Sequence, residues 1–201
     1  MTLELLLAHP EMVRLAEALE RTPGRQIGRD EPMRWAAIAL VLRLGEMGDP
    51  ELLMIKRAEA EKDPWSGHVA CPGGRAETGD RDLAHTAMRE TREETGIDLA
   101  RVGRLLGTLD DISPSSPVLP RIVVRPFIAA VPSGVEIVPS PEVAESFWVP
   151  LSALREVRAW ALGTLSVRGV PREVSTFTHG EYMVWGLTER VLKQLLQRMA
   201  P

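Results

Sequence analysis

Residues 73–97 read GGRAETGDRDLAHTAMRETREETGI, a run that opens with two glycines and closes on a group of glutamates. The spacing predicts a helix over residues 82–94, because this segment consists of good helix formers with one apolar face. That face carries Leu83, Ala87 and Met88. Gly96 stands where a residue in the left-handed conformation commonly ends a helix. We therefore expect a loop, a helix and a tight C-terminal cap along this stretch.

Three glutamates share one face of the predicted helix, since Glu90, Glu93 and Glu94 occupy positions i, i+3 and i+4. Like charges at this spacing cost about 0.2–0.5 kcal/mol per pair on an exposed helix, and the helix dipole disfavours anions at the C-terminal end. The simplest structural interpretation is a solvated acidic face, eased by Arg89 and Arg92. The functional interpretation is a site for Mg²⁺ or Mn²⁺, because hard divalent cations bind clustered carboxylate oxygens on a rigid support.

The same stretch resembles the Nudix box, the motif G-x5-E-x7-R-E-U-x-E-E-x-G-U in which U is an aliphatic residue. Residues 89–97 supply the second half of the motif, with Thr91 in place of one aliphatic residue. Gly74 and Asp80 supply the first half, although eight residues rather than seven separate Asp80 from the box arginine. The extra residue leaves both Glu77 and Asp80 as candidates for the acid that forms the salt bridge of the box.

This resemblance implies a Nudix hydrolase with an α+β fold, a Nudix-type α/β/α sandwich around a mixed β-sheet. It implies that Glu90 and Glu94 are the principal metal ligands, and that Glu93 is a further ligand or the general base. Arg89 would orient a glutamate through a bidentate contact. The backbone of Gly73 and Gly74 would approach the metal and the substrate closely. The implied cofactor is Mg²⁺ or Mn²⁺, and the implied partner is a small-molecule pyrophosphate substrate.

A second signature, upstream of the box, is similar to the coenzyme A pyrophosphatase branch of the family. That branch carries L-L-T-x-R-S-x-x-L-R-x-H-x-G-Q-V-x-F-P-G-G, and this chain keeps Leu53, Arg57, Gly67, Val69 and Pro72-Gly73-Gly74. His68 and Cys71 replace the Gln and Phe of the signature, and residues 63–65 replace its L-R-x-H part. The branch implies cleavage of coenzyme A or a derivative to 4′-phosphopantetheine and adenosine 3′,5′-bisphosphate.

Two other functions stay open from the sequence. One is the same reaction on ADP-ribose, a dinucleotide cofactor or a nucleoside triphosphate, because residues outside the box choose the substrate. The other belongs to a different class, a catalytically silent Nudix-fold module that binds a nucleotide. Such a module would be expected to lose its metal-binding glutamates, and this chain keeps all three.

Candidate residues outside the box are few. The proton of an attacking water needs a base, and Glu142 or Glu145 could supply one, although isolated glutamates before a strand are often only solvated. Arg57, Arg121 and Arg125 are candidates for binding the substrate phosphates. Arg121 and Arg125 are four residues apart on a predicted strand and so share a face, which a solvent-facing strand edge would explain equally well.

The remaining chemistry-bearing side chains have more ordinary interpretations. His68 and His85 have no partner at metal-ligand spacing, and we interpret both as packing or surface residues. Cys71 lies on a short predicted strand and is interpreted as a core residue rather than a nucleophile. Trp65 and Trp185 could stack on an adenine, although a structural role is more common for tryptophan.

Composition narrows the possible partners. The chain has 201 residues, with 24 Lys and Arg against 28 Asp and Glu, so a nucleic-acid partner is not expected. Its single cysteine fits a reducing cytosol, and the N-terminus lacks the basic start of a signal peptide. We therefore expect a cytoplasmic protein without a membrane span. The oligomeric state stays open, with a homodimer as one expectation.

Hydrophobic patterning predicts the other elements. Helices are expected over residues 10–21, 151–157 and 186–199, and strands over residues 35–44, 51–56, 103–109, 121–130 and 146–149. Two further short strands are expected before the last helix. Because the elements do not alternate regularly, the pattern favours an α+β fold. We expect residues 1–30 to form an N-terminal helical extension and residues 31–201 to form the Nudix hydrolase domain.

Overall fold

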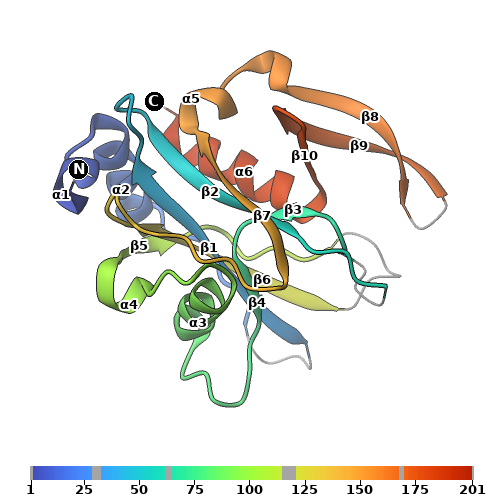
Figure 1. Cartoon of the computed structure of the whole chain (residues 1–201), viewed down its shortest axis with the longest axis horizontal. Coiled ribbons are helices and arrows are strands. Elements are labelled where there is room, and N and C mark those ends of the chain that lie inside the picture. The colour runs from blue at the N-terminus through green and yellow to red at the C-terminus, as the bar shows by residue number, and fades with distance from the viewer. Residues whose placement is uncertain (1, 29–32, 62–64, 115–120, 168–169, 201) are drawn as a thin grey trace.

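The computed structural model describes residues 2–28, 33–61, 65–114, 121–167 and 170–200 (Figure 1). In chain order the elements are α1 (Leu3–Leu7), α2 (Pro10–Arg21), β1 (Arg34–Leu44), β2 (Pro50–Arg57), β3 (Val69–Ala70), β4 (Gly73–Arg75), α3 (Leu83–Thr95), α4 (Leu99–Val102), β5 (Arg104–Thr108), β6 (Ile122–Ala130), β7 (Val143–Pro150), α5 (Leu151–Leu154), the 3₁₀ turn η1 (Val157–Ala159), β8 (Trp160–Val167), β9 (Val170–His179), β10 (Tyr182–Trp185) and α6 (Gly186–Met199). No helix in these ranges is long and apolar enough to cross a membrane.

The main sheet is mixed, because β1 pairs in parallel with β6 whereas the other strand pairs are antiparallel. Its order is β3-β2-β1-β6-β5, with β4 beside β1 and β7 beside β2. Strands β3 and β4 belong to one extended segment that changes partner. Ala70 pairs with Ile55 of β2, whereas Gly74 pairs with Ala37 of β1. The segment therefore crosses from β2 to β1, and its two glycines follow directly after the crossing.

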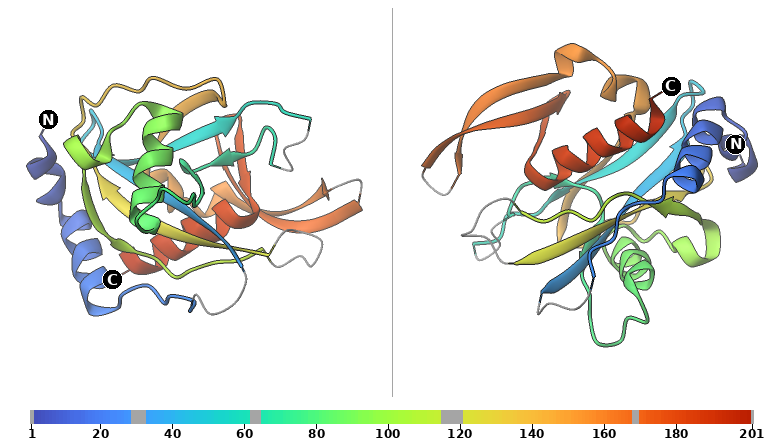
Figure 2. Two further views of the ribbon diagram at one scale, coloured as in Figure 1. Left: turned by 90° about the horizontal axis from the view of Figure 1, so that it is seen from below. Right: turned by 180° about the vertical axis from the view of Figure 1, so that it is seen from behind.

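Strand β1 is apolar on both faces, as a central strand covered on both sides must be. Leu40 and Leu42 lie in the core shared with α2 and α6, whereas Ala39 and Val41 lie in the core under α3. Figure 2 shows α3 and α6 on opposite faces of the sheet. This layering confirms the predicted α/β/α sandwich with a mixed sheet.

The N-terminal helices belong to the same core as α6. Leu6, Met12 and Leu15 are fully buried there. Helix α2 begins with Pro10 in its first turn and ends at Arg21, as predicted, because proline suits the first turn and apolar residues recur at helical spacing after it.

The C-terminal third differs from the sequence prediction in its strands. Three strands, rather than two short ones, form a second sheet in the order β10-β9-β8, and β8 and β9 make a long hairpin. Gly163, Ser166 and several threonines interrupt the hydrophobic alternation that would have indicated these strands. Phe177 of β9 and Val184 of β10 are buried in the core shared with α6, and Trp160 of β8 packs against that core. These strands are therefore held by packing as well as by pairing with one another.

Two element boundaries near β7 also differ from the sequence prediction. The predicted helix over residues 151–157 ends at Leu154, because Leu151 and Leu154 are buried whereas Val157 is 87% exposed and would bury nothing in a further turn. Strand β7 begins at Val143 rather than at residue 146, since it pairs along the whole length of β2.

Candidate active site

Helix α3 carries the glutamates and is capped at both ends. The Asp82 carboxylate accepts a hydrogen bond of 2.7 Å from the backbone N–H of His85, which fixes the N-terminus. Gly96 has a φ of +74° and donates its N–H to the Arg92 carbonyl at 2.9 Å, which ends the helix. The predicted helix and its glycine cap are confirmed, and the buried side of α3 fixes the direction in which the glutamates point.

The two glycines allow the chain to pass between β1 and α3. Gly73 has a φ of +152°, and a Cβ there would lie 2.3 Å from the Ala37 carbonyl oxygen. A Cβ on Gly74 would lie 2.4 Å from the carboxylate carbon of Glu90. Only glycine fits this passage without a shift of its neighbours.

Glu94 lies at the centre of the site. Its side chain is 5% exposed, and its carboxylate accepts the Gly73 N–H at 2.8 Å and contacts Arg57 Nη1 at 3.4 Å. Burial raises the pKa of Glu94 to about 7, although the Gly73 N–H and Arg57 lower it, and the charges of Glu90 and Glu142 raise it further. The charge of this carboxylate is therefore only partly compensated by the protein.

Arg89 holds the other acidic groups in place. Its guanidinium bonds both oxygens of Asp80 at 3.0 Å, and Nη1 donates to Glu90 and to Glu93, each at 2.9 Å. Nη2, which is one of the two nitrogens that bond Asp80, also donates to the Arg75 carbonyl at 2.9 Å. Because all three guanidinium nitrogens are engaged, the arginine fixes the carboxylates of α3 relative to the segment that follows β4.

The structure places Asp80, and not Glu77, in the salt bridge with Arg89. A turn in which Asp80 N–H donates to the Glu77 carbonyl at 3.0 Å takes up the extra residue of the box. Thr86 Oγ1 and His85 Nδ1 also lie 2.9 Å from the Asp80 carboxylate. The Arg89 guanidinium holds the pKa of Asp80 well below its usual range. His85 thus contacts the acid of the salt bridge rather than a metal-ligand set.

The donor set fits a hard divalent cation. Glu90, Glu93 and Glu94 offer carboxylate oxygens on one rigid helix, and burial raises the pKa of Glu90 even beside Arg89. Raised pKa values on adjacent carboxylates mean that a nearby positive charge would stabilise their ionised forms. In the described part of the chain, no three acidic, histidine or cysteine side chains are gathered closely enough to hold a metal ion. At this site, Glu90 and Glu93 both bond Arg89. Glu93 is 58% exposed, so its side chain can reorient.

The two glutamates predicted outside the box have different surroundings. Glu145 bonds Lys56 at 2.9 Å and accepts the Tyr182 hydroxyl at 2.7 Å, and both hydrogen bonds lower its pKa. Its neighbour Phe147 packs into the core shared with α6, so Glu145 lies on the face opposite α3. Glu142 instead lies close enough to Glu94 for its charge to raise the pKa of Glu94.

The three predicted arginines are not brought together. Arg57 contacts Glu94, as described above. Arg125 makes a bidentate ion pair with the buried Asp111, with both distances 2.8 Å, and lies over Trp35 at 5.9 Å. It belongs to β6, which flanks β1 on the side away from β4. Arg121 is exposed just before β6.

The other singled-out side chains are largely structural. Cys71 is buried, as predicted, and burial raises the pKa of its thiol to about 12. The His68 ring lies 4.6 Å from the Trp185 ring and packs against it at a tilt. Trp65 is half-buried.

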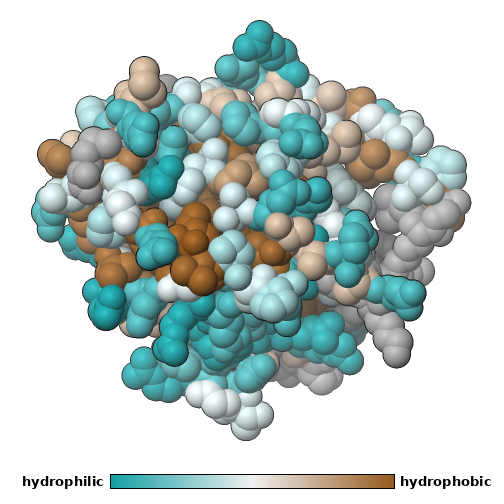
Figure 3. Space-filling view, viewed as in Figure 1, coloured by the Kyte–Doolittle hydropathy of each residue, from teal (hydrophilic) through white to brown (hydrophobic). Residues whose placement is uncertain are grey.

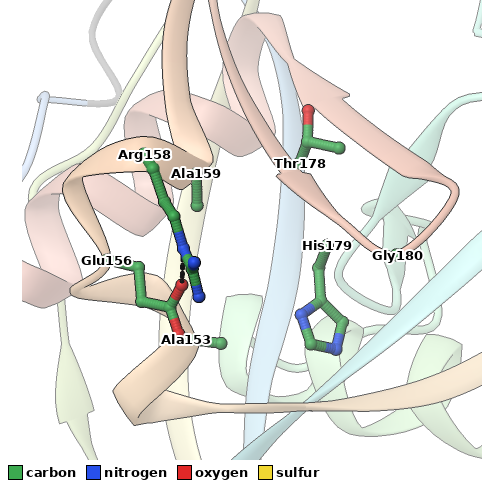
Figure 4. Close-up of a pocket in the computed structure, with 7 residues that line it drawn as sticks. All are labelled: Ala153, Glu156, Arg158, Ala159, Thr178, His179 and Gly180. Atoms are coloured by element: carbon green, nitrogen blue, oxygen red, sulfur yellow. Dashed lines mark hydrogen bonds and ion pairs between the residues drawn. The ribbon is translucent and has the colours of Figure 1, made fainter.

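A cavity of about 430 Å³ lies apart from these residues, between α5, η1 and the β9–β10 turn (Figure 4). An ion pair of 2.7 Å between Glu156 and Arg158 lies on one side of it, and His179 lies on the other. None of the predicted site residues lines this cavity. Over α3, in contrast, the surface is largely hydrophilic, as Figure 3 shows at its lower centre.

Comparisons with known proteins agree with this geometry. The NUDIX domain family matches residues 33–166. A Nudix hydrolase of uncharacterised function named NudL, from Photorhabdus laumondii, is 32% identical over 151 residues, which cover 75% of this chain and 78% of the relative. The NudL protein of Yersinia pestis strain Pestoides F is 30% identical over 153 residues, 76% of this chain and 74% of its own.

Solved structures share the fold. The NUDIX domain of Shewanella oneidensis NrtR has a TM-score of 0.56 at 16% identity, covering 85% of this chain and 90% of that one. A MutT/nudix family protein from Enterococcus faecalis has a TM-score of 0.55 at 16% identity, covering 96% and 72%. With the family match, the capped carboxylate helix and the diglycine passage together, the chain belongs to the Nudix family and is a Nudix pyrophosphohydrolase.

Proposed function

We propose that this protein hydrolyses the pyrophosphate bond of a nucleoside-diphosphate-linked small molecule, with Mg²⁺ or Mn²⁺ as cofactor and coenzyme A or a derivative as substrate. The observation that carries the proposal is the placement of Glu94, a buried carboxylate bonded to the Gly73 N–H and flanked by Glu90. A fold gains little stability from two partly compensated acids at this position, whereas a divalent cation would compensate both.

In this proposal Glu90 and Glu94 would hold the metal, and Glu93, whose side chain is exposed, would be a further ligand or the general base. The metal, when bound, neutralises phosphate charge and lowers the pKa of a bound water. Arg89 keeps Glu90 oriented, and Asp80 keeps Arg89 in place. We assign Arg57 to the pyrophosphate rather than to a distant part of the substrate, because it contacts Glu94.

The proton of the attacking water needs an acceptor near the carboxylates. Glu93 and Glu142 are our candidates, because Glu93 lies on α3 with the other carboxylates and the charge of Glu142 raises the pKa of Glu94. Glu145 is bonded to Lys56 and Tyr182 on the other face. We therefore propose one of the first two as the base.

The coenzyme A assignment is supported by the sequence upstream of the box. Arg57, which the branch signature contains, lies at the site rather than elsewhere. The chain departs from the signature over residues 63–65, which lie partly outside the described residues. Hydrolysis of ADP-ribose, a dinucleotide cofactor or a nucleoside triphosphate is therefore the alternative in the same reaction class.

One experiment separates these substrates. We would measure kcat/KM with Mg²⁺ for coenzyme A, dephospho-coenzyme A and ADP-ribose. We assign the 3′-phosphate to Arg121, which is exposed just before β6. Loss of that phosphate should then lower kcat/KM by about tenfold or more, because a charge-assisted phosphate contact is worth about 1.5–3 kcal/mol. Faster turnover of ADP-ribose than of coenzyme A would overturn the branch assignment. No turnover of any pyrophosphate compound, together with nucleotide binding, would favour the silent module instead.

A further inference from the structure

The second sheet has a strand edge that lacks a partner in the described part of the chain. Strand β8 ends the order β10-β9-β8, and the strand paired with it is β9. The β8–β9 hairpin projects beyond the body of the molecule (Figure 2). An exposed edge presents a row of backbone N–H and C=O groups that can pair with another strand.

This edge has none of the usual features that block such pairing. Strand β8 reads WALGTLSV, with no charged residue and no proline. The edges of the main sheet are different. Strand β7 carries Glu145 and ends at Pro150, whereas β5 contains a register shift and packs against α2. Natural proteins protect strand edges with charges, prolines, bulges or a covering helix, and β8 has no such protection.

Apolar surface surrounds the start of the same strand. Leu162 is 73% exposed, and it shares a face of β8 with Trp160. Trp160 also lines an apolar hollow of about 480 Å³ between η1 and the end of α6, whose other apolar walls include Leu154, Val157, Leu196 and Met199. The hollow and the start of β8 therefore adjoin at Trp160.

We propose that β8 pairs antiparallel with β8 of a second copy of this chain, so that two three-stranded sheets become one sheet of six strands. A two-fold axis perpendicular to the sheet reverses the strand and keeps its faces, as antiparallel pairing requires. The absence of charge favours a second copy as the partner. If β8 carried a charge, that charge would face the same charge of the second copy across the axis and repel it. Strand β8 carries no charge, so it can pair with itself without repulsion and has no charge that would select a different strand.

The pairing also covers the apolar surface. With the axis near the middle of the strand, at Gly163 or Thr164, Leu162 of each copy lies beside the partner strand. The end of the partner strand then approaches Trp160 and the hollow beside it. Association thus removes apolar surface from water in addition to pairing the backbone.

The test uses charge at the centre of the edge. Sedimentation velocity of the full chain over a concentration series should show a monomer–dimer equilibrium. Thr164→Lys and Thr164→Glu should each raise the dissociation constant by about tenfold or more, because like charges then meet across the axis. An equal mixture of the two variants should associate more tightly than either alone, since opposite charges now face each other. Leu5→Lys, at an exposed leucine of α1, is the matched control and should not change association.

Thr164 is exposed and pairs with Glu173 of β9, so Thr164→Glu also places a like charge within the hairpin. Circular dichroism of both variants therefore has to show the wild-type fold before their association is compared. A wild-type chain that stays monomeric overturns the proposal and leaves the edge to a strand of another protein. Association that persists unchanged in both variants, or a mixture no tighter than its components, overturns it as well. Because β8 lies outside the carboxylate site, this result is independent of the proposed hydrolysis.

Discussion

Asp80 and Arg89 form a bidentate ion pair, with Nε on Oδ1 and Nη2 on Oδ2 at 3.0 Å each. The Asp80 side chain is 3% exposed and the Arg89 side chain 18% exposed. The pair joins the loop after β4 to α3, and the same guanidinium holds Glu90 and Glu93. The acid that pairs with this arginine therefore supports both the fold and the site.

Asp80→Asn should destabilise the protein at neutral pH by about 1.5–3 kcal/mol, since it removes a charge-assisted bond to Arg89. Because the folded-state pKa of Asp80 is lowered, the ionised carboxylate contributes stability above the unfolded pKa of about 3.9, and this contribution is lost as the pH falls. Urea unfolding of variant and wild type should thus converge at acid pH. Glu77→Gln, at an exposed glutamate of the same loop, is the control; an Asp80→Asn penalty independent of pH would contradict the ion-pair account.

Glu94→Gln should lower kcat by orders of magnitude while the free energy of unfolding holds or rises. The amide keeps the shape of the side chain and removes a buried, partly compensated charge. Mg²⁺ should raise the melting temperature of the wild type and not that of the variant, and EDTA should abolish wild-type hydrolysis. Glu20→Gln on α2 serves as the control. Full wild-type activity in EDTA would refute the metal site.

Gly74→Ala should reduce kcat by about tenfold or more with a smaller effect on stability. The added Cβ would lie 2.4 Å from the Glu90 carboxylate carbon, so this side chain must move and the metal ligand is displaced. Gly79→Ala is the matched control, because a Cβ at Gly79 meets nothing within 4 Å. Equal activities of the two variants would show that the position of Glu90 does not matter for turnover.

Glu142→Gln should lower kcat more than Glu145→Gln does, because Glu142 lies near Glu94 whereas Glu145 is bonded to Lys56 and Tyr182 on the other sheet face. Loss of a general base commonly costs about 10²–10⁴-fold. The pH–rate profile should change only for the residue that takes the proton. If the Glu145 variant shows the larger loss of kcat, our assignment of the general base to the residues near Glu94 is wrong.

The amino-acid sequence was sufficient for features set by short-range geometry. The glutamates at 90, 93 and 94 share a face because a helix repeats every 3.6 residues, and Gly96 ends that helix because it adopts a positive φ without steric cost. The apolar run of β1 likewise indicated a strand covered on both sides. Each of these features depends on residues a few positions apart, so each can be predicted from the sequence alone.

The tertiary structure was needed wherever a partner lies far along the chain. Arg125 bonds Asp111, and Glu145 bonds Tyr182, 37 residues later in the chain. Neither partner could be predicted, because the face of the sheet on which a side chain lies is known only once the strand is paired. The structure also shows that Asp80, and not Glu77, pairs with Arg89, since the path of a loop depends on the helix against which it packs. The β8–β9 hairpin is held by pairing between its own strands and by Phe177 in the core, and its hydrophobic pattern was too weak to predict it.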